Sequence, residues 1–316
     1  MKINCLIGDT PIVKIQIQFN QKIQNIYAKL EYYNYTGSIK DRIANYIIFK
    51  SYETGELKKN MPIVEATSGN TGISFAALGA LYKHPVHIFM PDWVSSERIK
   101  IMELYGAKVY LVTRKDGGFK EAIKRADNFA EKIGGFRPNQ FSNELNTQAH
   151  YEGTGTEIIN KVPKISAFVS GIGTGGTLIG VSKKIKEKFN DAKIIAMEPE
   201  NMTLLSKKKK VGNHKIEGIG DDFIPKLVDR KYIDKVITIN DEEAINMTKR
   251  LATELGLGVG ISSGANFLAS VLSEEDNVVT IFADDVKKYL TTDLTLKKEK
   301  KQYISDRIKF IDMEVL

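Results

Sequence analysis

From residue 62 onward, short apolar runs rich in valine and isoleucine alternate with helical patterns, and this alternation restricts the chain to few folds. The predicted strands cover residues 62–65, 86–90, 108–112, 165–170, 193–197, 236–239 and 278–282. Strands that alternate with helices form parallel sheets in α/β proteins. We therefore expect an α/β protein with open, twisted and mostly parallel sheets.

The chain has 316 residues, which is long enough for two such domains. The composition offers one boundary between them, the loop from Gly134 to Asn146. We therefore predict an N-terminal α/β domain over residues 1–145 and a C-terminal α/β domain over residues 146–316. Two further strands are predicted near the N-terminus, and the final twenty residues are charged and ambiguous.

Composition argues against several classes of protein. The single cysteine, Cys5, excludes an internal disulfide and a cysteine metal cluster, and four scattered histidines argue against a metal site. The net charge of +7 is concentrated in Lys207–Lys210 and in Lys297–Lys301, without interleaved aromatic residues, so we expect no nucleic-acid partner. No run of about 18 apolar residues and no signal peptide are present, so we expect a cytoplasmic protein without a membrane partner.

A lysine stands between a glycine-containing turn and a helical pattern. Lys40 follows Thr36-Gly37-Ser38-Ile39, and an apolar helical face continues after it. A lysine held in such a place can face a cleft instead of bulk water, which favours its neutral and nucleophilic form. The alternative is a surface lysine after an ordinary helix cap.

Residues 171–177 form a glycine-rich turn between a predicted strand and a helix. The backbone N–H groups of such a turn and the positive end of the helix dipole can bind a phosphate group. Gly171, Gly173 and Gly176 also satisfy the dinucleotide pattern, with Glu198 where a ribose ligand would stand. A nicotinamide-dependent dehydrogenase is therefore an alternative. It gives no role to Lys40 or to the Thr-Ser-Gly-Asn-Thr-Gly turn of residues 67–72, so we favour a monophosphate cofactor and an amino-acid carboxylate.

Several longer segments occur in an order that is specific to one family. They are IGDTPIVKI, NYTGSIKDR, EATSGNTG, MPDWVSSERIKIMELYGA, NQFSN, HYEGTGTEI, SGIGTGGT, HKIEGIGDDFIP and GISSGAN. Over roughly residues 3 to 294, the chain resembles the cysteine synthase and cystathionine β-synthase family of pyridoxal-phosphate enzymes. These enzymes have the tryptophan-synthase-β fold, also called fold type II. The resemblance implies pyridoxal 5'-phosphate in the cleft between two domains, an amino-acid substrate and a homodimer.

The resemblance also implies a role for each matching residue. Lys40 is the expected Schiff-base lysine, Asn70 the partner of the cofactor's phenolic oxygen, and Ser262 the residue that faces the pyridine nitrogen. A neutral hydroxyl at that nitrogen favours β-elimination over transamination. The expected phosphate ligands are Gly173, Thr174, Gly175, Gly176 and Thr177. The expected ligands of the substrate α-carboxylate are Thr67, Ser68, Gly69, Thr71 and Gln140.

The implied chemistry is removal of the Cα proton by Lys40, loss of the β-substituent to give an aminoacrylate, and addition of a nucleophile. The chain departs from cysteine synthases at Asp221-Asp222, where that family usually has small residues. A carboxylate there would repel hydrosulfide and could take a proton from water or a thiol. We therefore predict Asp222, and less strongly Asp221, as a general base; the alternative is an Asx-turn residue.

These inferences predict an enzyme that releases hydrogen sulfide from L-cysteine and adds water to give L-serine, a cysteine (hydroxyl) lyase reaction. Three alternatives stay open. The first is synthesis of cysteine from O-acetylserine and sulfide, and the second is condensation with homocysteine to cystathionine. The third is a cofactor-binding protein without turnover, against which the intact Lys40 argues.

Overall fold

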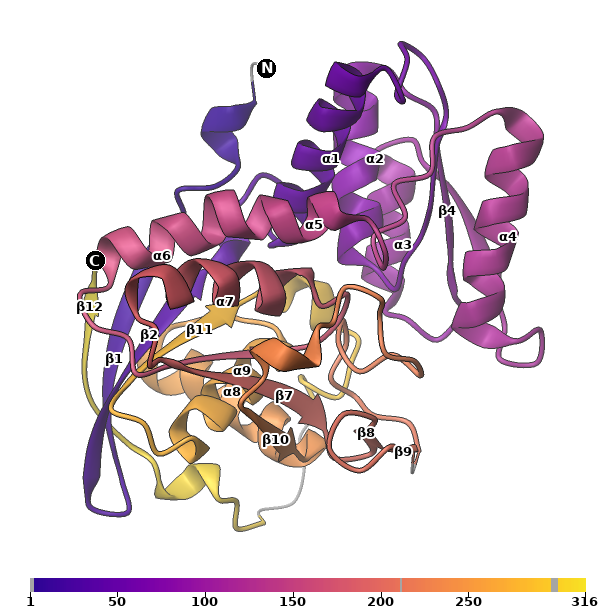
Figure 1. Ribbon diagram of the computed structural model, residues 1–316. Helices are drawn as coiled ribbons and strands as arrows, with labels where there is room; N and C mark the ends of the chain where they lie inside the picture. The colour runs from indigo at the N-terminus through magenta and orange to yellow at the C-terminus, as the bar shows by residue number, and fades with distance from the viewer. Residues whose placement is uncertain (1–2, 211, 297–300) are drawn as a thin grey trace.

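The computed structural model describes residues 3–210, 212–296 and 301–316, and its fold is the predicted α/β type with mostly parallel sheets (Figure 1). Residues 297–300 of the predicted basic tail lie outside the described part. Within that part, no helix combines the length and apolar character that crossing a membrane requires. Two main sheets, one of seven strands and one of three, form the framework.

The larger sheet has the strand order β10-β7-β6-β11-β2-β1-β12. The five strands from β10 to β2 are parallel, whereas β1 and β12 extend the sheet by antiparallel pairing. The strands are β1 (Ile12–Phe19), β2 (Lys22–Leu30), β6 (Ala167–Gly171), β7 (Lys193–Pro199), β10 (Lys235–Ile239), β11 (Asn277–Phe282) and β12 (Lys309–Val315). A hairpin of β8 (Met202–Thr203) and β9 (Lys209–Lys210) lies apart and contains part of the predicted lysine run.

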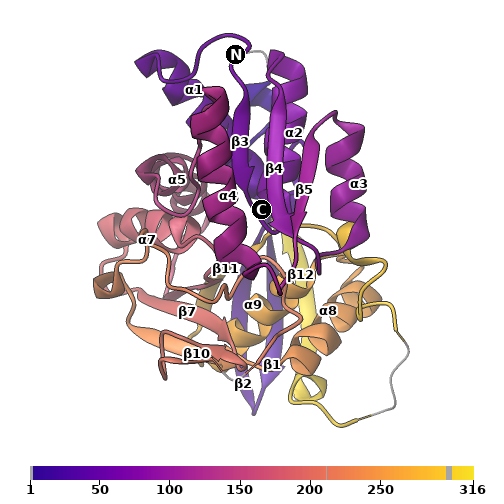
Figure 2. The ribbon, with the colours of Figure 1, turned by 90° about the vertical axis from the view of Figure 1, so that its right-hand side faces the viewer.

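The smaller sheet is parallel and has the order β3-β4-β5, with β3 (Ile63–Ala66), β4 (Val86–Pro91) and β5 (Lys108–Val112). Figure 2 shows α4 (Gly118–Ile133) on one face of this sheet. The helices α1 (Lys40–Thr54), α2 (Asn70–Tyr82) and α3 (Ser96–Leu104) belong to its other side. Each face has its own buried apolar cluster, which is why both faces need a helical cover.

The larger sheet is also covered on both faces. The helices α8 (Asp241–Leu255) and α9 (Ile261–Leu272) pack on one apolar cluster, and α7 (Gly176–Lys188) packs on the other. Between the sheets, α5 (Glu144–Ala149), a π-helical turn (His150–Gly155) and α6 (Thr156–Lys161) run on from one another toward the larger sheet (Figure 1). Asn240 caps α8, because its side chain accepts a hydrogen bond from the Glu242 N–H at 2.8 Å.

Segments from before residue 145 also contribute to the larger sheet. Strands β1 and β2 come first in the chain, yet β2 pairs with β11 in the larger sheet. The ambiguous C-terminal segment adds β12, whose Met313 pairs with Ile15 of β1. The division of the chain into domains at residue 145 therefore stays a prediction, and we propose that residues 12–30 group with the larger sheet.

A buried charge cluster fastens the start of α1 to the larger sheet. Arg42 donates from Nη2 to Glu31 Oε1 at 2.8 Å and from Nη1 to Glu157 Oε1 at 2.7 Å. Glu31 directly follows β2 and is 0% exposed, and Glu157 lies in α6. Ion pairs withdrawn from water lose much stability when one partner is removed, because the other charge stays buried.

We predict that Arg42→Ala lowers the free energy of unfolding by about 3–5 kcal/mol, since it leaves Glu31 buried without its cation. Urea unfolding of both proteins measures this difference. The matched control is Arg125→Ala, which breaks a partly exposed pair with Glu121 and should cost about 0.5 kcal/mol. Equal losses in the two variants would contradict a structural role for the Arg42 cluster.

Candidate active site

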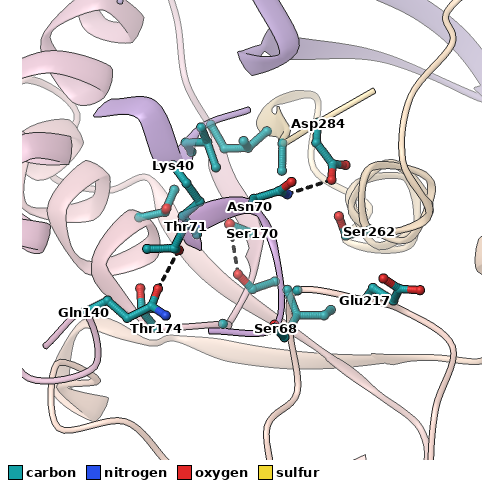
Figure 3. A pocket seen from close by; sticks show the side chains of 18 of the residues that line it. Lys40, Ser68, Asn70, Thr71, Gln140, Ser170, Thr174, Glu217, Ser262 and Asp284 are labelled. Carbon is teal, nitrogen blue, oxygen red and sulfur yellow. Dashed lines mark hydrogen bonds between the residues drawn. The ribbon is translucent and has the colours of Figure 1, made fainter. Parts of the chain in front are cut away.

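Strands of both sheets end at one cavity. The segments that follow β2, β3, β6 and β11 all contribute to its lining, as expected at the carboxyl ends of parallel strands. Figure 3 shows that these side chains converge from separate parts of the chain. Most of the predicted site residues are among them: Lys40, Thr67, Ser68, Asn70, Thr71, Gln140, Gly173, Thr174, Gly175, Thr177 and Ser262.

Lys40 is the first residue of α1, and the turn before it is held from the larger sheet. Gly37 has a φ of +81°, a conformation that glycine adopts without strain, and its carbonyl accepts a hydrogen bond from Lys288 Nζ at 3.0 Å. The Ile39 N–H donates to the Ala283 carbonyl at 2.9 Å. Lys40 is thereby placed between the two sheets.

The environment of Lys40 favours its neutral form more than water would. Burial lowers the pKa of Lys40 to about 8, although the carboxylates of Asp284, Glu31 and Asp221 oppose this shift. With such a pKa, about one amine in ten is neutral at pH 7. The environment thus agrees with the neutral, nucleophilic amine that the sequence predicts.

The predicted carboxylate loop follows β3. Thr71 donates from Oγ1 to Gln140 Oε1 at 2.7 Å, and Gln140 Nε2 donates to the Ala66 carbonyl at 2.9 Å. These bonds set the orientation of the Gln140 amide. Gly69 is absent from the cavity lining, and a Cβ atom there would lie 2.4 Å from Cδ of Arg98. Glycine is required at this position because the Arg98 side chain passes directly beside it.

The predicted phosphate loop joins β6 to the N-terminus of α7. Gly175 has a φ of +88°, and a Cβ atom at Gly173 would lie 2.4 Å from the carbonyl oxygen of Gly218. Gly176 is absent from the lining, but a Cβ atom there would lie 1.9 Å from Asn146 Oδ1. Asn146 also donates to Thr174 Oγ1 at 2.9 Å. The loop therefore combines a helix N-terminus with backbone that side chains cannot obstruct, which suits a phosphate.

Two more predicted residues reach the cavity from helix starts. Ser262 lies in the first turn of α9 and is 5% exposed. Asn70 begins α2 and donates from Nδ2 to Asp284 Oδ2 at 2.7 Å. The other amide atom of Asn70, Oδ1, is buried without a hydrogen-bond partner. A buried acceptor without a partner fits a site that is completed by a bound group.

The two adjacent aspartates lie in different surroundings. Asp221 lines the cavity of Lys40, whereas Asp222 lines only the adjoining outer cavity and approaches Lys120 Nζ at 3.6 Å. Burial and the negative charge of Asp222 raise the pKa of Asp221 to about 7, against the opposing effect of Lys40. The structure thus brings Asp221, not the favoured Asp222, to the lysine.

Sequence reasoning missed three charged residues that line the same cavity, Arg98, Glu217 and Asp284. Arg98 forms an ion pair with Glu217, and its Nη2 lies 3.7 Å from Asp284 Oδ2. Asp284 comes two residues after the end of β11, as other site residues follow their strands. That position was a signal available in the sequence. Arg98 gave no such signal, because it lies within a helix of mixed charge.

Comparison with known proteins agrees with this geometry. Residues 3–284 match the family model described as "Pyridoxal-phosphate dependent enzyme". A cysteine synthase from Staphylococcus aureus is 38% identical over 296 residues, which cover 92% of this chain and 95% of that protein. Cysteine synthase B from Campylobacter jejuni is 41% identical over 299 residues, which cover 93% of this chain and 98% of that protein.

A solved structure is similar over the whole chain. It is the hydrogen sulfide-producing enzyme from Fusobacterium nucleatum, with a TM-score of 0.95, 46% identity, and coverage of 100% of this chain and 98% of that one. An aspartate-to-asparagine mutant of the hydrogen sulfide-producing enzyme, equally similar, was solved in complex with an α-aminoacrylate intermediate.

The dinucleotide alternative is wrong, because the matching family uses pyridoxal phosphate. The structure gives a local reason as well. Glu198 cannot serve as a free ribose ligand, since its carboxylate accepts hydrogen bonds from the N–H groups of Leu205 at 2.9 Å and Ser206 at 3.0 Å.

We predict that Gly176→Ala weakens pyridoxal-phosphate binding at least tenfold, because the added methyl group collides with Asn146 beneath the phosphate loop. Absorbance titration of the cofactor-free protein measures the dissociation constant. The control is Gly212→Ala, where a Cβ atom meets nothing within 4 Å. Unchanged affinity in Gly176→Ala would show that the loop does not hold the phosphate.

Proposed function

Because the chain belongs to the family of pyridoxal-phosphate dependent enzymes, we propose that it converts L-cysteine and water to hydrogen sulfide and L-serine. The enzyme is cysteine synthase-like and acts on amino acids. The observation that carries the finer proposal is the carboxyl group of Asp221 in the cavity of Lys40. A cytoplasmic homodimer, as the family resemblance implies, stays a prediction.

The residues present fit the cofactor. The phosphate loop at α7 would hold the phosphate, Lys40 would bind the aldehyde carbon, and Asn70 and Ser262 would face the ring. The unpartnered Oδ1 of Asn70 and the open backbone of the loop support this placement. When bound, the cofactor acts as a sink for the electron pair left at the substrate Cα.

Lys40 moves the proton at Cα. Its amine removes this proton and later returns it, and a pKa near 8 lets the same group do both close to neutral pH. The loop of Thr67, Ser68 and Thr71, with Gln140, orients the substrate by its α-carboxylate. The hydrogen bonds of Gln140 with Thr71 and with the Ala66 carbonyl hold the loop before the substrate arrives.

Asp221 moves the proton of water. The Cβ–S bond breaks, and the sulfur leaves as hydrosulfide, which takes one proton from solvent to become hydrogen sulfide. Water then forms the Cβ–O bond and gives its proton to Asp221, which releases it to solvent and so balances the proton taken by the sulfur. A carboxyl group with a pKa near 7 suits this exchange, since general bases work best with a pKa close to the working pH.

The charge of the cavity favours a neutral nucleophile. Glu217, Asp221 and Asp284 contribute three carboxyl groups to the lining, against the cations Lys40 and Arg98. An ionised Asp221 repels an incoming hydrosulfide ion but attracts the proton of water. The similarity to a hydrogen sulfide-producing enzyme, over the whole chain, supports release of sulfide as the physiological direction.

Synthesis of cysteine from O-acetylserine and sulfide is the second candidate, and the curated relatives named cysteine synthase favour it. The two candidates separate in one assay. The purified enzyme is given L-cysteine alone, and sulfide and serine are measured; a parallel sample receives O-acetylserine and sulfide. Equal amounts of serine and sulfide from cysteine support the proposal. Rapid cysteine synthesis with little serine would overturn it.

We predict that Asp221→Asn slows serine formation about 100-fold or more, the usual contribution of a positioned general base. Asp222→Asn is the matched control, because it removes the neighbouring carboxylate, which lines only the outer cavity. At pH 8 and above, where Asp221 is mainly ionised with or without the charge of Asp222, it should keep serine formation within about threefold of the original. Single-turnover experiments that follow sulfide and serine separately distinguish the steps. If Asp222→Asn were the slower variant, the base would be Asp222.

We also predict that serine formation falls as the pH drops through about 7. The raised pKa of Asp221 means that its basic, ionised form predominates above pH 7 and is lost below it. Below pH 7, each decrease of one pH unit should then slow serine formation about tenfold. The rate of serine formation between pH 5 and 9 measures this dependence. Persistence of the same acidic limb in Asp221→Asn would assign it to another group.

A further inference from the structure

Asp284 is a buried carboxyl group to which the proposed reaction assigns no proton transfer. It follows β11, is 0% exposed, and lines the cavity beside Asn70 and Ser262 (Figure 3). A carboxylate buried this completely is costly unless it is paired or hydrogen-bonded. Its partners therefore indicate what it does.

Two side chains donate hydrogen bonds to the same oxygen of Asp284. Asn70 Nδ2 lies 2.7 Å from Oδ2, and the Tyr289 hydroxyl lies 2.8 Å from it. An ionised carboxylate can only accept hydrogen bonds, so the nitrogen of the Asn70 amide must face Asp284. The amide orientation of Asn70 is thereby fixed, and its buried Oδ1 is left without a partner.

Two positively polarised groups lie close to the Asp284 carboxylate. Arg98 Nη2 lies 3.7 Å from Oδ2. The other oxygen, Oδ1, has no hydrogen-bond partner and packs against Gly260, since a Cβ atom there would lie 2.0 Å from it. Gly260 is the N-cap of α9, and the N-terminus of a helix attracts negative charge.

This charge acts on Lys40. Among the carboxylates that raise the pKa of Lys40, Asp284 has the largest effect, ahead of Glu31 and Asp221. Arg98 does not cancel that effect by itself, because it also forms an ion pair with Glu217. Asp284 therefore contributes a negative charge that acts on Lys40 from this side of the cavity.

We propose that Asp284 is a positioning residue that fixes the Asn70 amide and helps keep a proton on the nitrogen of Lys40 when the cofactor is bound there. A proton on this nitrogen favours its displacement by the amine of an incoming amino acid. The proposal rests on attachment of the cofactor to Lys40 and not on water as the nucleophile. It applies equally to an enzyme that makes cysteine.

Other charged and titratable groups meet Lys40 and Asp284 from the elements packed around them. Those that affect Lys40 are Glu31 after β2, Asp221 in the loop between β9 and β10, and His150 in the π-helical turn. Those around Asp284 are Arg98 in α3, Glu217, Asp285, Lys288 and Tyr289. Replacement of Asp284 alone leaves all of these groups in place.

The test is a pH titration of the visible absorbance of the bound cofactor, without substrate, in the holoenzyme. Asp284→Asn keeps the size of the side chain but removes its charge. We expect the pH at which the Lys40 nitrogen loses its proton to fall by about one unit, the shift typical of one nearby charge. We also expect weaker cofactor binding, because an amide at position 284 no longer dictates the orientation of Asn70.

Asp285→Asn is the matched control. It removes the neighbouring carboxylate, which accepts a helix-capping hydrogen bond from the Lys287 N–H at 2.9 Å. Asp285 is not among the groups that shift the pKa of Lys40. Its titration midpoint should stay unchanged. Asp284→Ser, smaller and neutral, replaces Asp284→Asn if that variant does not fold. A folded Asp284 variant with the original midpoint would overturn the proposal, whatever reaction the enzyme performs.

Discussion

The ion pairs of Arg42 with Glu31 and Glu157 are the interaction on which the active site most depends. Arg42 lies two residues after Lys40, in a helix that covers the smaller sheet, whereas Glu31 directly follows a strand of the larger sheet. Glu157 lies in α6, so the cluster also connects this helix to the larger sheet, and its carboxylate lies 2.7 Å from Lys29 Nζ. The cluster therefore holds the lysine helix against the larger sheet, between the substrate loop and the phosphate loop.

Burial dominates the acid–base chemistry of the cavity. It lowers the pKa of Lys40 and raises the pKa of Asp221, and in both cases it outweighs the attraction between these two opposite charges. Both groups consequently titrate near neutral pH. In water the amine would stay protonated and the carboxyl ionised, and neither could exchange protons readily. Because the cavity withdraws both residues from water, both can exchange protons near neutral pH.

Much of the fold and of the site could be predicted, because the information lies in short local segments. The strand, turn and helix around Gly171–Thr177 are contiguous in sequence, and so is the turn before Lys40. Pairings between distant segments could not be predicted in this way. Strand β12 has the charged composition of an exposed edge strand and is recognisable only through its pairing with β1. Asp284 gains its role from Asn70, which lies 214 positions away in the sequence.

The choice between Asp221 and Asp222 shows the same limit within one dipeptide. Adjacent side chains leave the backbone in different directions, so only one of two neighbouring aspartates lines the cavity of Lys40, and residue type cannot say which. Gly220 decides it: its N–H donates to the Ile172 carbonyl at 2.9 Å, and its own carbonyl lies 2.8 Å from His214 Nε2. These bonds fix the register of the loop beside the phosphate turn. A slip of one residue would exchange the two carboxylates, placing Asp222 at the lysine and Asp221 in the outer cavity.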